Sequence, residues 1–312
     1  MWTPLARHPA EVGRHGTIDG TPLLALQMLT LLAMTGSVVT RLWQDHPWLG
    51  FALVGAAIVA WAPELARTRV RRWWFVYVAG TFVYTLLRSL ADETAIPIRT
   101  DYVIEADQFL FAGHHPVVAL QKRFFDPDQV RFLDLLAVGT HWSFFLAPHA
   151  VAVAIFLFRP KLFRGYVLLS VITLYLGLAL FFLLPTTPPW LAAQEGALPG
   201  AFRVMDFVGG RVSSTTYQDF YASLGEPNSV AAMPSIHMAI TFAMYLWTRA
   251  NARRWSWLLL AYCALMAVAL VYLAEHYVAD LAVGVLCALM AFVAVRLMAR
   301  ERTSLSPSEG SG

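Results

Sequence analysis

Charged residues are scarce in this chain. They make up 14% of its 312 residues, whereas hydrophobic residues make up 58%, and the mean hydropathy is +0.56. A soluble domain has about a quarter of its residues charged and less than half apolar. The composition therefore excludes an ordinary soluble protein and indicates an integral membrane protein. The net charge of +3 is too small to indicate nucleic-acid binding.

Cysteine is nearly absent as well. The only two cysteines, Cys263 and Cys287, both lie within apolar runs. The sequence therefore predicts free, buried thiols and excludes a disulfide framework. Metal ligation by these two residues is not expected.

Eight apolar runs predict an all-α membrane protein with about eight transmembrane helices. Each run approaches or exceeds the roughly 20 residues that cross a bilayer, although the second run is short. The first run follows a basic, polar segment, as in a signal sequence. Its length and the lack of a small-residue cleavage site favour an uncleaved span. The runs cover residues 21–43, 48–63, 73–90, 133–158, 164–184, 233–249, 255–274 and 277–297.

Basic residues predict the orientation of these spans. With eight spans, 15 of the 23 Lys and Arg residues lie on one side, in both terminal segments and in short loops near 67–72, 159–164 and 249–254. Short basic loops remain in the cytoplasm, so both termini are predicted to be cytoplasmic. If the short second run did not cross, the basic loops would fall on both sides. Eight spans are therefore favoured over seven.

The spans divide the chain into three predicted parts. Residues 1–72 hold a tail and the first two spans, residues 73–298 hold the other six spans, and 299–312 form a tail that is expected to be disordered. Two long loops between the last six spans, 91–132 and 185–232, are predicted to face the extracytoplasmic side. The first suits one or two amphipathic helices, either in the membrane interface or as a folded cap. The second opens with a segment too rich in proline for a helix, and its Pro188, Pro189 and Trp190 are expected to form a lid or wall.

Two histidine groups stand at the starts of apolar runs, on the same predicted face of the membrane. In the first, Pro234-Ser235-Ile236-His237, the proline and serine predict a helix start whose free N–H groups form an anion site. In the second, the four-residue spacing of His276 and Asp280 places both side chains on one helix face. A carboxylate beside an imidazole fixes its tautomer and raises its nucleophilicity. Catalysis is therefore favoured over a structural hydrogen-bonded pair or half of a metal site.

The remaining polar residues of the spans are weaker candidates. His141 and His149 lie in the 133–158 run and are expected to be hydrogen-bonded packing residues. Arg88, with Asp92 four residues later, is either a snorkelling arginine with a local salt bridge or a guanidinium that clamps phosphate oxygens. Lys122 and Arg123 are lesser candidates for binding phosphate, because a charge cluster in a loop usually faces solvent or headgroups.

These residues resemble the type 2 phosphatidic acid phosphatase superfamily. The second motif of that superfamily has Pro-Ser-x-His at its core and matches Met233 to His237, and its third motif ends in His-x-x-x-Asp and matches His276 and Asp280. The resemblance covers roughly residues 73–298. It implies that these residues form a six-helix catalytic core, to which the two helices of residues 1–72 are additions. Within the superfamily, the chain is most similar to the branch of fungal inositol phosphorylceramide synthase and its bacterial relatives. This similarity rests on Pro188-Pro189-Trp190 and on the segment from Tyr272 to Leu281.

The chain departs from the phosphatase branch at two cations. The Arg-Pro of the first motif is present as Arg159-Pro160, but Ala152 stands at the position where a lysine is usual. This Arg-Pro also lies on the predicted cytoplasmic side. The arginine that usually precedes the third-motif histidine is also missing, with Ala269, Leu270 and Val271 in that region. Both gaps favour the synthase-like branch, and Arg88 is the expected replacement.

The resemblance implies transfer of a phosphate or phospho-headgroup of a lipid through a phosphohistidine, with no metal or organic cofactor. In this scheme His276 attacks phosphorus, Asp280 orients it, and His237 protonates the leaving oxygen. Ser235, helix-start N–H groups and Arg88 hold the phosphate. The implied partners are the bilayer, a phospholipid or lipid phosphate, and an alcohol or lipid acceptor, as in sphingolipid metabolism.

Two alternatives to this transferase remain at the level of the sequence. One is a hydrolase, a lipid phosphate or polyprenyl diphosphate phosphatase. The other is a proton-coupled transporter, which would need histidines along a path across the bilayer. His237 and His276 instead lie near one membrane face in the predicted topology.

Overall fold

The computed structural model describes residues 72–88, 96–212 and 232–304, together with five single positions between 25 and 33. The chain divides into two units, Met1–Glu64 and Leu65–Gly312. The helices described below belong to the second unit. Apart from those single positions, the predicted spans at 21–43 and 48–63 lie outside the described residues.

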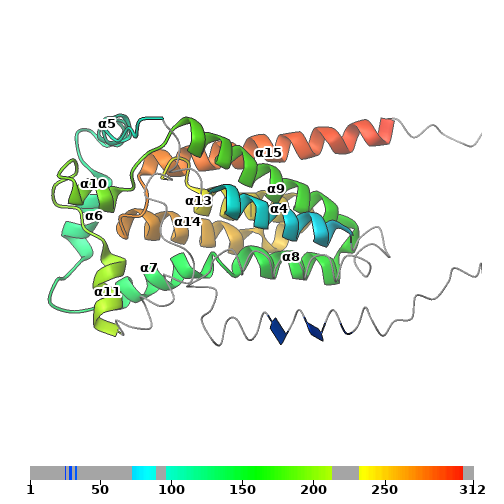
Figure 1. Cartoon of the computed structure of the whole chain (residues 1–312), viewed down its shortest axis with the longest axis horizontal. Coiled ribbons are helices and arrows are strands. Elements are labelled where there is room, and N and C mark those ends of the chain that lie inside the picture. Colours follow the sequence, from blue (N-terminus) through cyan, green and yellow to red (C-terminus); the bar gives the residue numbers. More distant parts are fainter. Residues whose placement is uncertain are drawn as a thin grey trace, which may run out of the picture. The chain divides into compact units, whose positions relative to one another are not determined.

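Helices make up the regular structure of the described ranges, and no β-strand occurs there. Helix α13 is the centre of the bundle, because it contacts α9, α14 and α15, while α4 and α8 pack against α9. Figure 1 shows these helices running side by side. Their bounds lie close to those of the predicted apolar runs: α4 (Arg72–Arg88), α8 (Ala147–Phe158), α9 (Pro160–Leu183), α13 (Ile236–Asn251), α14 (Ser256–Tyr272) and α15 (Val278–Ser304).

Several of the described helices are long and apolar enough to cross a membrane. Three meet this condition by themselves, Pro160–Leu183, Arg253–Tyr272 and Val278–Arg300, and a bent pair could make a fourth. Helices α4 and α13 have 17 and 16 residues, which is about 25 Å at 1.5 Å per residue. That length is a little short of a hydrocarbon core of about 30 Å. The three or four helices that are long enough make this an integral membrane protein, but eight spans are not confirmed.

The outer faces of α14 and α15 agree with a membrane environment. Large apolar side chains are exposed there, among them Trp257 at 63% and Val293 at 53%. In water such a continuous apolar face would be unfavourable, whereas lipid tails solvate it. The apolar surface on these two helices is what a lipid-facing surface requires.

The apolar run 133–158 forms two helices instead of the single predicted span. Helix α7 (Phe132–Ser143) and α8 are bent by 51° relative to each other. Residues 144–146 form a turn between them, and Pro148 then occupies the first turn of α8, where a missing N–H costs nothing. Hydrophobicity alone does not reveal such a bend.

Four short helices gather at one end of the bundle and cap it (Figure 1): α5 (Asp101–Leu110), α6 (Pro116–Phe124), α10 (Pro189–Gln194) and α11 (Val204–Val212). Helix α5 contacts α15, α6 contacts α14, and α11 contacts α7. The 91–132 loop thus contains two helices that pack as a folded cap.

Two details of the sequence prediction are wrong. Pro189 and Trp190 begin α10 despite the prolines, because proline is tolerated at the first helical position. Helix α15 continues to Ser304, beyond the start of the tail that was expected at 299.

A 3₁₀ turn, η2 (Arg253–Trp255), joins α13 to α14.

Candidate active site

Ser235 begins α13 and holds the first histidine in place. It is the N-cap residue, and its Oγ accepts a hydrogen bond of 3.3 Å from the N–H of Met238. Pro234 therefore lies just before the cap residue. His237 lies in the first turn of α13, at the helix start that the sequence predicted.

His276 and Asp280 form a dyad at the start of α15. The His276 Nδ1 lies 3.3 Å from Asp280 Oδ2, and the same oxygen accepts a bond of 3.0 Å from the N–H of Tyr277. Both side chains are buried, at 5% and 0% exposed. The predicted contact is present, but its geometric basis was wrong. Because α15 begins at Val278, His276 precedes the helix and does not share a helix face with Asp280.

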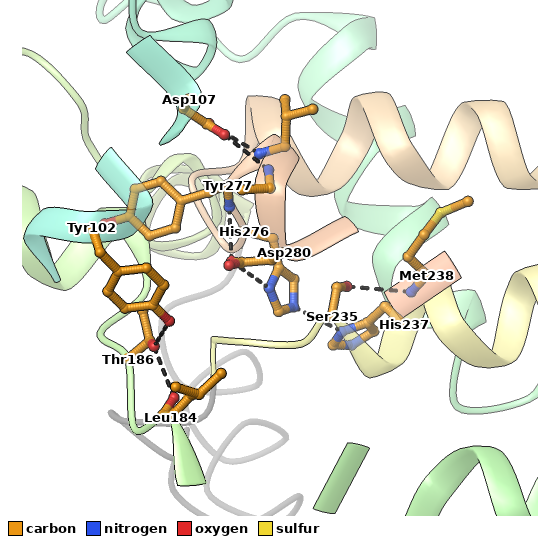
Figure 2. A network of polar contacts seen from close by, with 12 residues as sticks. Tyr102, Asp107, Leu184, Thr186, Ser235, His237, Met238, His276, Tyr277 and Asp280 are labelled. Carbon is orange, nitrogen blue, oxygen red and sulfur yellow. Dashed lines mark hydrogen bonds and ion pairs between the residues drawn. The ribbon is translucent and has the colours of Figure 1, made fainter. Parts of the chain in front are cut away.

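The two histidine groups face each other, as Figure 2 shows. His237 Nδ1 lies 3.4 Å from His276 Nε2, on the side of that ring opposite Asp280. The backbone N–H of Ser235 also donates to the carbonyl of Asp280 at 3.1 Å, which ties the two helix starts together. Ser235, His237, His276 and Asp280, predicted from two separate motifs, thus form one cluster.

A glycine allows the two helices to approach this closely. At Gly284 on α15, an added Cβ would overlap the backbone oxygen of Ser235 and crowd the N–H of Ala239. At Gly177 on α9, a Cβ would instead meet the flexible end of Ile236. A side chain at residue 284 would push the backbone of α15 away from the backbone at the start of α13. This shift would separate His237 from His276.

The N-terminus of α15 is already occupied by a protein carboxylate. Asp107 of α5 accepts hydrogen bonds from Ala279 at 2.8 Å and Val278 at 3.0 Å (Figure 2). Burial raises the pKa of the Asp107 carboxyl, and these two N–H groups oppose the shift. With Asp280 on the Tyr277 N–H, carboxylates satisfy the donors that open the helix. The start of α15 is therefore closed to phosphate, whereas the start of α13 carries no such carboxylate among the contacts of the described residues.

The cap holds the connector between α14 and α15, which carries His276. Gln121 of α6 donates to the carbonyl of Tyr272 at 2.8 Å, and the N–H of Trp190 donates to the carbonyl of Ala274 at 3.0 Å. Ala274 itself has a positive φ of 61°, an uncommon conformation for a residue with a Cβ. The predicted wall segment, including the buried Pro188 and Pro189, therefore lies against the connector that positions the dyad.

A third histidine lies against the site. The ring of His141 stacks on His237 with centroids 4.6 Å apart, and Phe144 covers the same ring at 4.4 Å. Both residues belong to the end of α7 and the bend that follows it. His141 was predicted to be a packing residue, and its sequence gives no local signal for this contact. His149 instead pairs with the hydroxyl of Tyr77 at 2.9 Å.

The candidate phosphate-binding cations differ in their placement. Arg88 ends α4 and is partly buried. Lys122 and Arg123 are exposed on the last turn of α6. Asp92, the expected partner of Arg88, lies outside the described residues. Within the described ranges, no three His, Cys, Asp or Glu side chains are arranged to hold a metal ion.

A family model described as the PAP2 superfamily matches residues 102–294. The chain belongs to this superfamily. As a PAP2 protein it is a membrane enzyme of the lipid phosphatase and phosphotransferase type, which replaces the transporter alternative. No curated protein and no solved structure matches the chain. The matched residues include both histidine groups, and Arg88 precedes them.

Proposed function

We propose that this PAP2 protein is a lipid phosphotransferase of the inositol phosphorylceramide synthase type that works through a phosphohistidine at His276. The observation that carries the proposal is the orientation of His276. Its Nδ1 contacts the Asp280 carboxylate, and its Nε2 faces His237. Asp280 thereby favours the tautomer with hydrogen on Nδ1, which leaves a lone pair on Nε2 for attack.

The proposed reaction has two steps. In the first, His276 Nε2 attacks phosphorus, the bond from phosphorus to the leaving oxygen breaks, and the proton on His237 moves to that oxygen. In the second, the hydroxyl of the acceptor gives its proton to His237 and its oxygen displaces the Nε2 of His276. The enzyme then returns to its starting state, and Asp280 stabilises the positive imidazole in both steps.

The phosphate oxygens need positive compensation near this pair. The start of α13, with its Ser235 cap, supplies backbone N–H groups. Arg88, partly buried at the end of α4, supplies a guanidinium. Lys122 and Arg123 have less support, because both are exposed on α6. Pro188, Pro189 and Trp190 would shield the transferred group from water as a wall of the site.

The Arg88 assignment predicts a strong effect of a conservative change. Arg88→Lys keeps the charge but loses the two-pronged hydrogen-bonding geometry of the guanidinium. Since a charge-assisted bond contributes about 1.5–3 kcal/mol, kcat/KM should fall about tenfold or more. The measurement is turnover of a lipid substrate by the two proteins side by side. A fully active Arg88→Ala variant would move the assignment to Lys122 and Arg123.

The orientation and the span count are also proposals. We infer eight spans with both termini in the cytoplasm and the histidines at the extracytoplasmic face, because 15 of the 23 basic residues then lie on one side. A cysteine placed at residue 228 should react with a membrane-impermeant thiol reagent in intact cells. Reaction only after the cells are opened would overturn this topology.

The function itself is tested by incubating the purified protein with a panel of labelled lipid phosphates and phosphodiesters. Each donor is given with and without a polyol acceptor, and the products are resolved. A labelled lipid product that requires the acceptor supports the transferase, whereas release of phosphate or headgroup to water in every case supports the hydrolase alternative. Parallel reactions with EDTA should change little. Complete loss that Zn²⁺ restores would instead support a metal mechanism.

A further inference from the structure

Arg203 is held rigidly beside the connector that carries His276. It directly precedes α11, and its neighbour Phe202 forms two hydrogen bonds with the side chain of Gln121. The carbonyl of Phe202 accepts at 2.8 Å and its N–H donates at 3.0 Å. Because Gln121 also binds the carbonyl of Tyr272, one side chain fixes both segments relative to each other.

Glu275 and Trp190 hold the guanidinium of Arg203 in place. Its Nε donates to Glu275 at 3.0 Å, and the two side chains are only 10% and 11% exposed. Its central carbon lies 4.3 Å from the ring centroid of Trp190, the aromatic residue of the predicted wall. Asp206 lies farther away, at 3.5 Å, and its side chain is 53% exposed. Glu275 and Trp190 therefore determine the plane of the guanidinium, and the contact with Asp206 is screened by water.

This position brings a positive charge close to His276. Glu275, which holds Arg203, is the residue before His276. Trp190, over whose ring the guanidinium lies, donates through its backbone N–H to the carbonyl of Ala274, the residue before Glu275. Both partners of Arg203 are thus tied to the connector that carries the dyad, and they hold the guanidinium beside that connector.

We propose that Arg203 binds the phosphoryl oxygens of the group transferred at His276, an assignment that rests on the function proposed above. Phosphate brought to this site meets two buried carboxylates, Asp107 and Asp280. A phosphate among such groups requires cations on the protein to offset its charge. Arginine suits this task because its planar fork matches two phosphate oxygens, and a buried, oriented guanidinium loses little entropy on binding.

The competing interpretation is that Arg203 only holds the cap together through its ion pair with Glu275. The two interpretations differ in what removal of Glu275 does. If the ion pair matters for structure alone, Glu275→Gln and Arg203→Gln should have the same effect. If Arg203 binds phosphate, Glu275→Gln removes a carboxylate that competes for the guanidinium, so phosphate should bind as well as before or more tightly.

The test measures binding of inorganic phosphate to the purified full chain in nanodiscs by isothermal titration calorimetry. Arg203→Gln should weaken binding about tenfold or more, and Arg203→Lys about threefold or more, since a point charge lacks the fork. Glu275→Gln should keep or increase the affinity. Arg211→Gln is the matched control, because Arg211 is exposed on the last turn of α11 and donates to the carbonyls of Asp128 and Pro127. Its affinity should equal that of the unmodified protein.

Two results would overturn the assignment: unchanged phosphate binding in Arg203→Gln, or equal losses in Arg203→Gln and Glu275→Gln. The Arg203→Lys and Glu275→Gln variants keep the test informative if Arg203→Gln does not fold. The same titrations in a His276→Gln background separate this proposal from the phosphohistidine mechanism, because no phosphohistidine can form at residue 276 in that background. If the native enzyme forms no phosphohistidine but Arg203→Gln still lowers the affinity for phosphate, the mechanism fails and the Arg203 assignment stands.

Discussion

His276→Ala should abolish turnover, and Asp280→Asn should lower the rate by about 10⁴-fold, as removal of an orienting carboxylate does in other imidazole-based enzymes. The alanine variant lacks the nitrogen that attacks phosphorus. The asparagine variant keeps the shape of the site but loses the charge that stabilises the positive imidazole, and it can hold the ring in the wrong tautomer. The measurement is the initial rate of lipid turnover, together with trapping of an acid-labile phosphoenzyme from a labelled donor.

His149→Ala is the control for this experiment. His149 is also a histidine of the bundle, but it bonds to the hydroxyl of Tyr77 and not to the dyad. The variant should keep most of its activity and still form the phosphoenzyme. Substantial activity in His276→Ala, with the protein folded, would show that the nucleophile lies elsewhere.

The helical bundle could largely be predicted from the sequence, because apolar runs report directly on burial in lipid or in a core. The bend within 133–158 could not be predicted from hydrophobicity, since both halves are equally apolar. Pro148 was a usable signal, because proline favours the first turn of a helix. The cap was predicted as amphipathic segments, but its packing on α14 and α15 depends on contacts that no local pattern contains.

The candidate site divides in the same way. His276 and Asp280 were paired from their spacing, although His276 precedes α15 and the shared helix face behind that pairing is absent. Ser235 and His237 were found from a helix-start pattern. Asp107 was missed, and Arg203 was set aside as a cation of a long loop, because their partners lie far away in the sequence. Asp107 reaches across 172 residues to Ala279, and Arg203 across 72 residues to Glu275. A charged residue in a long loop gives no sign of such a partner, and only the folded cap brings it to the site.

His237→Ala should show a defect that depends on the leaving group. With a lipid alkoxide as the leaving group, loss of the general acid should lower kcat/KM by about 10²–10⁴-fold. With a p-nitrophenyl phosphodiester, the leaving oxygen is stable without a proton, so the first step should suffer much less. The physical basis is the position of His237 Nδ1, which lies 3.4 Å from the nitrogen that is proposed to attack phosphorus.

The two substrates also reveal the second step. Because His237 is the base that activates the acceptor, the variant should form the phosphoenzyme from the p-nitrophenyl substrate with a burst and then release it slowly. His276→Ala is the control, because a variant without the nucleophile should lose its activity on both substrates equally and show no burst. Equal loss on both substrates in His237→Ala would contradict the role of general acid. In that case His237 would position the phosphate, and the stacked His141 would be the next residue to test as the proton donor.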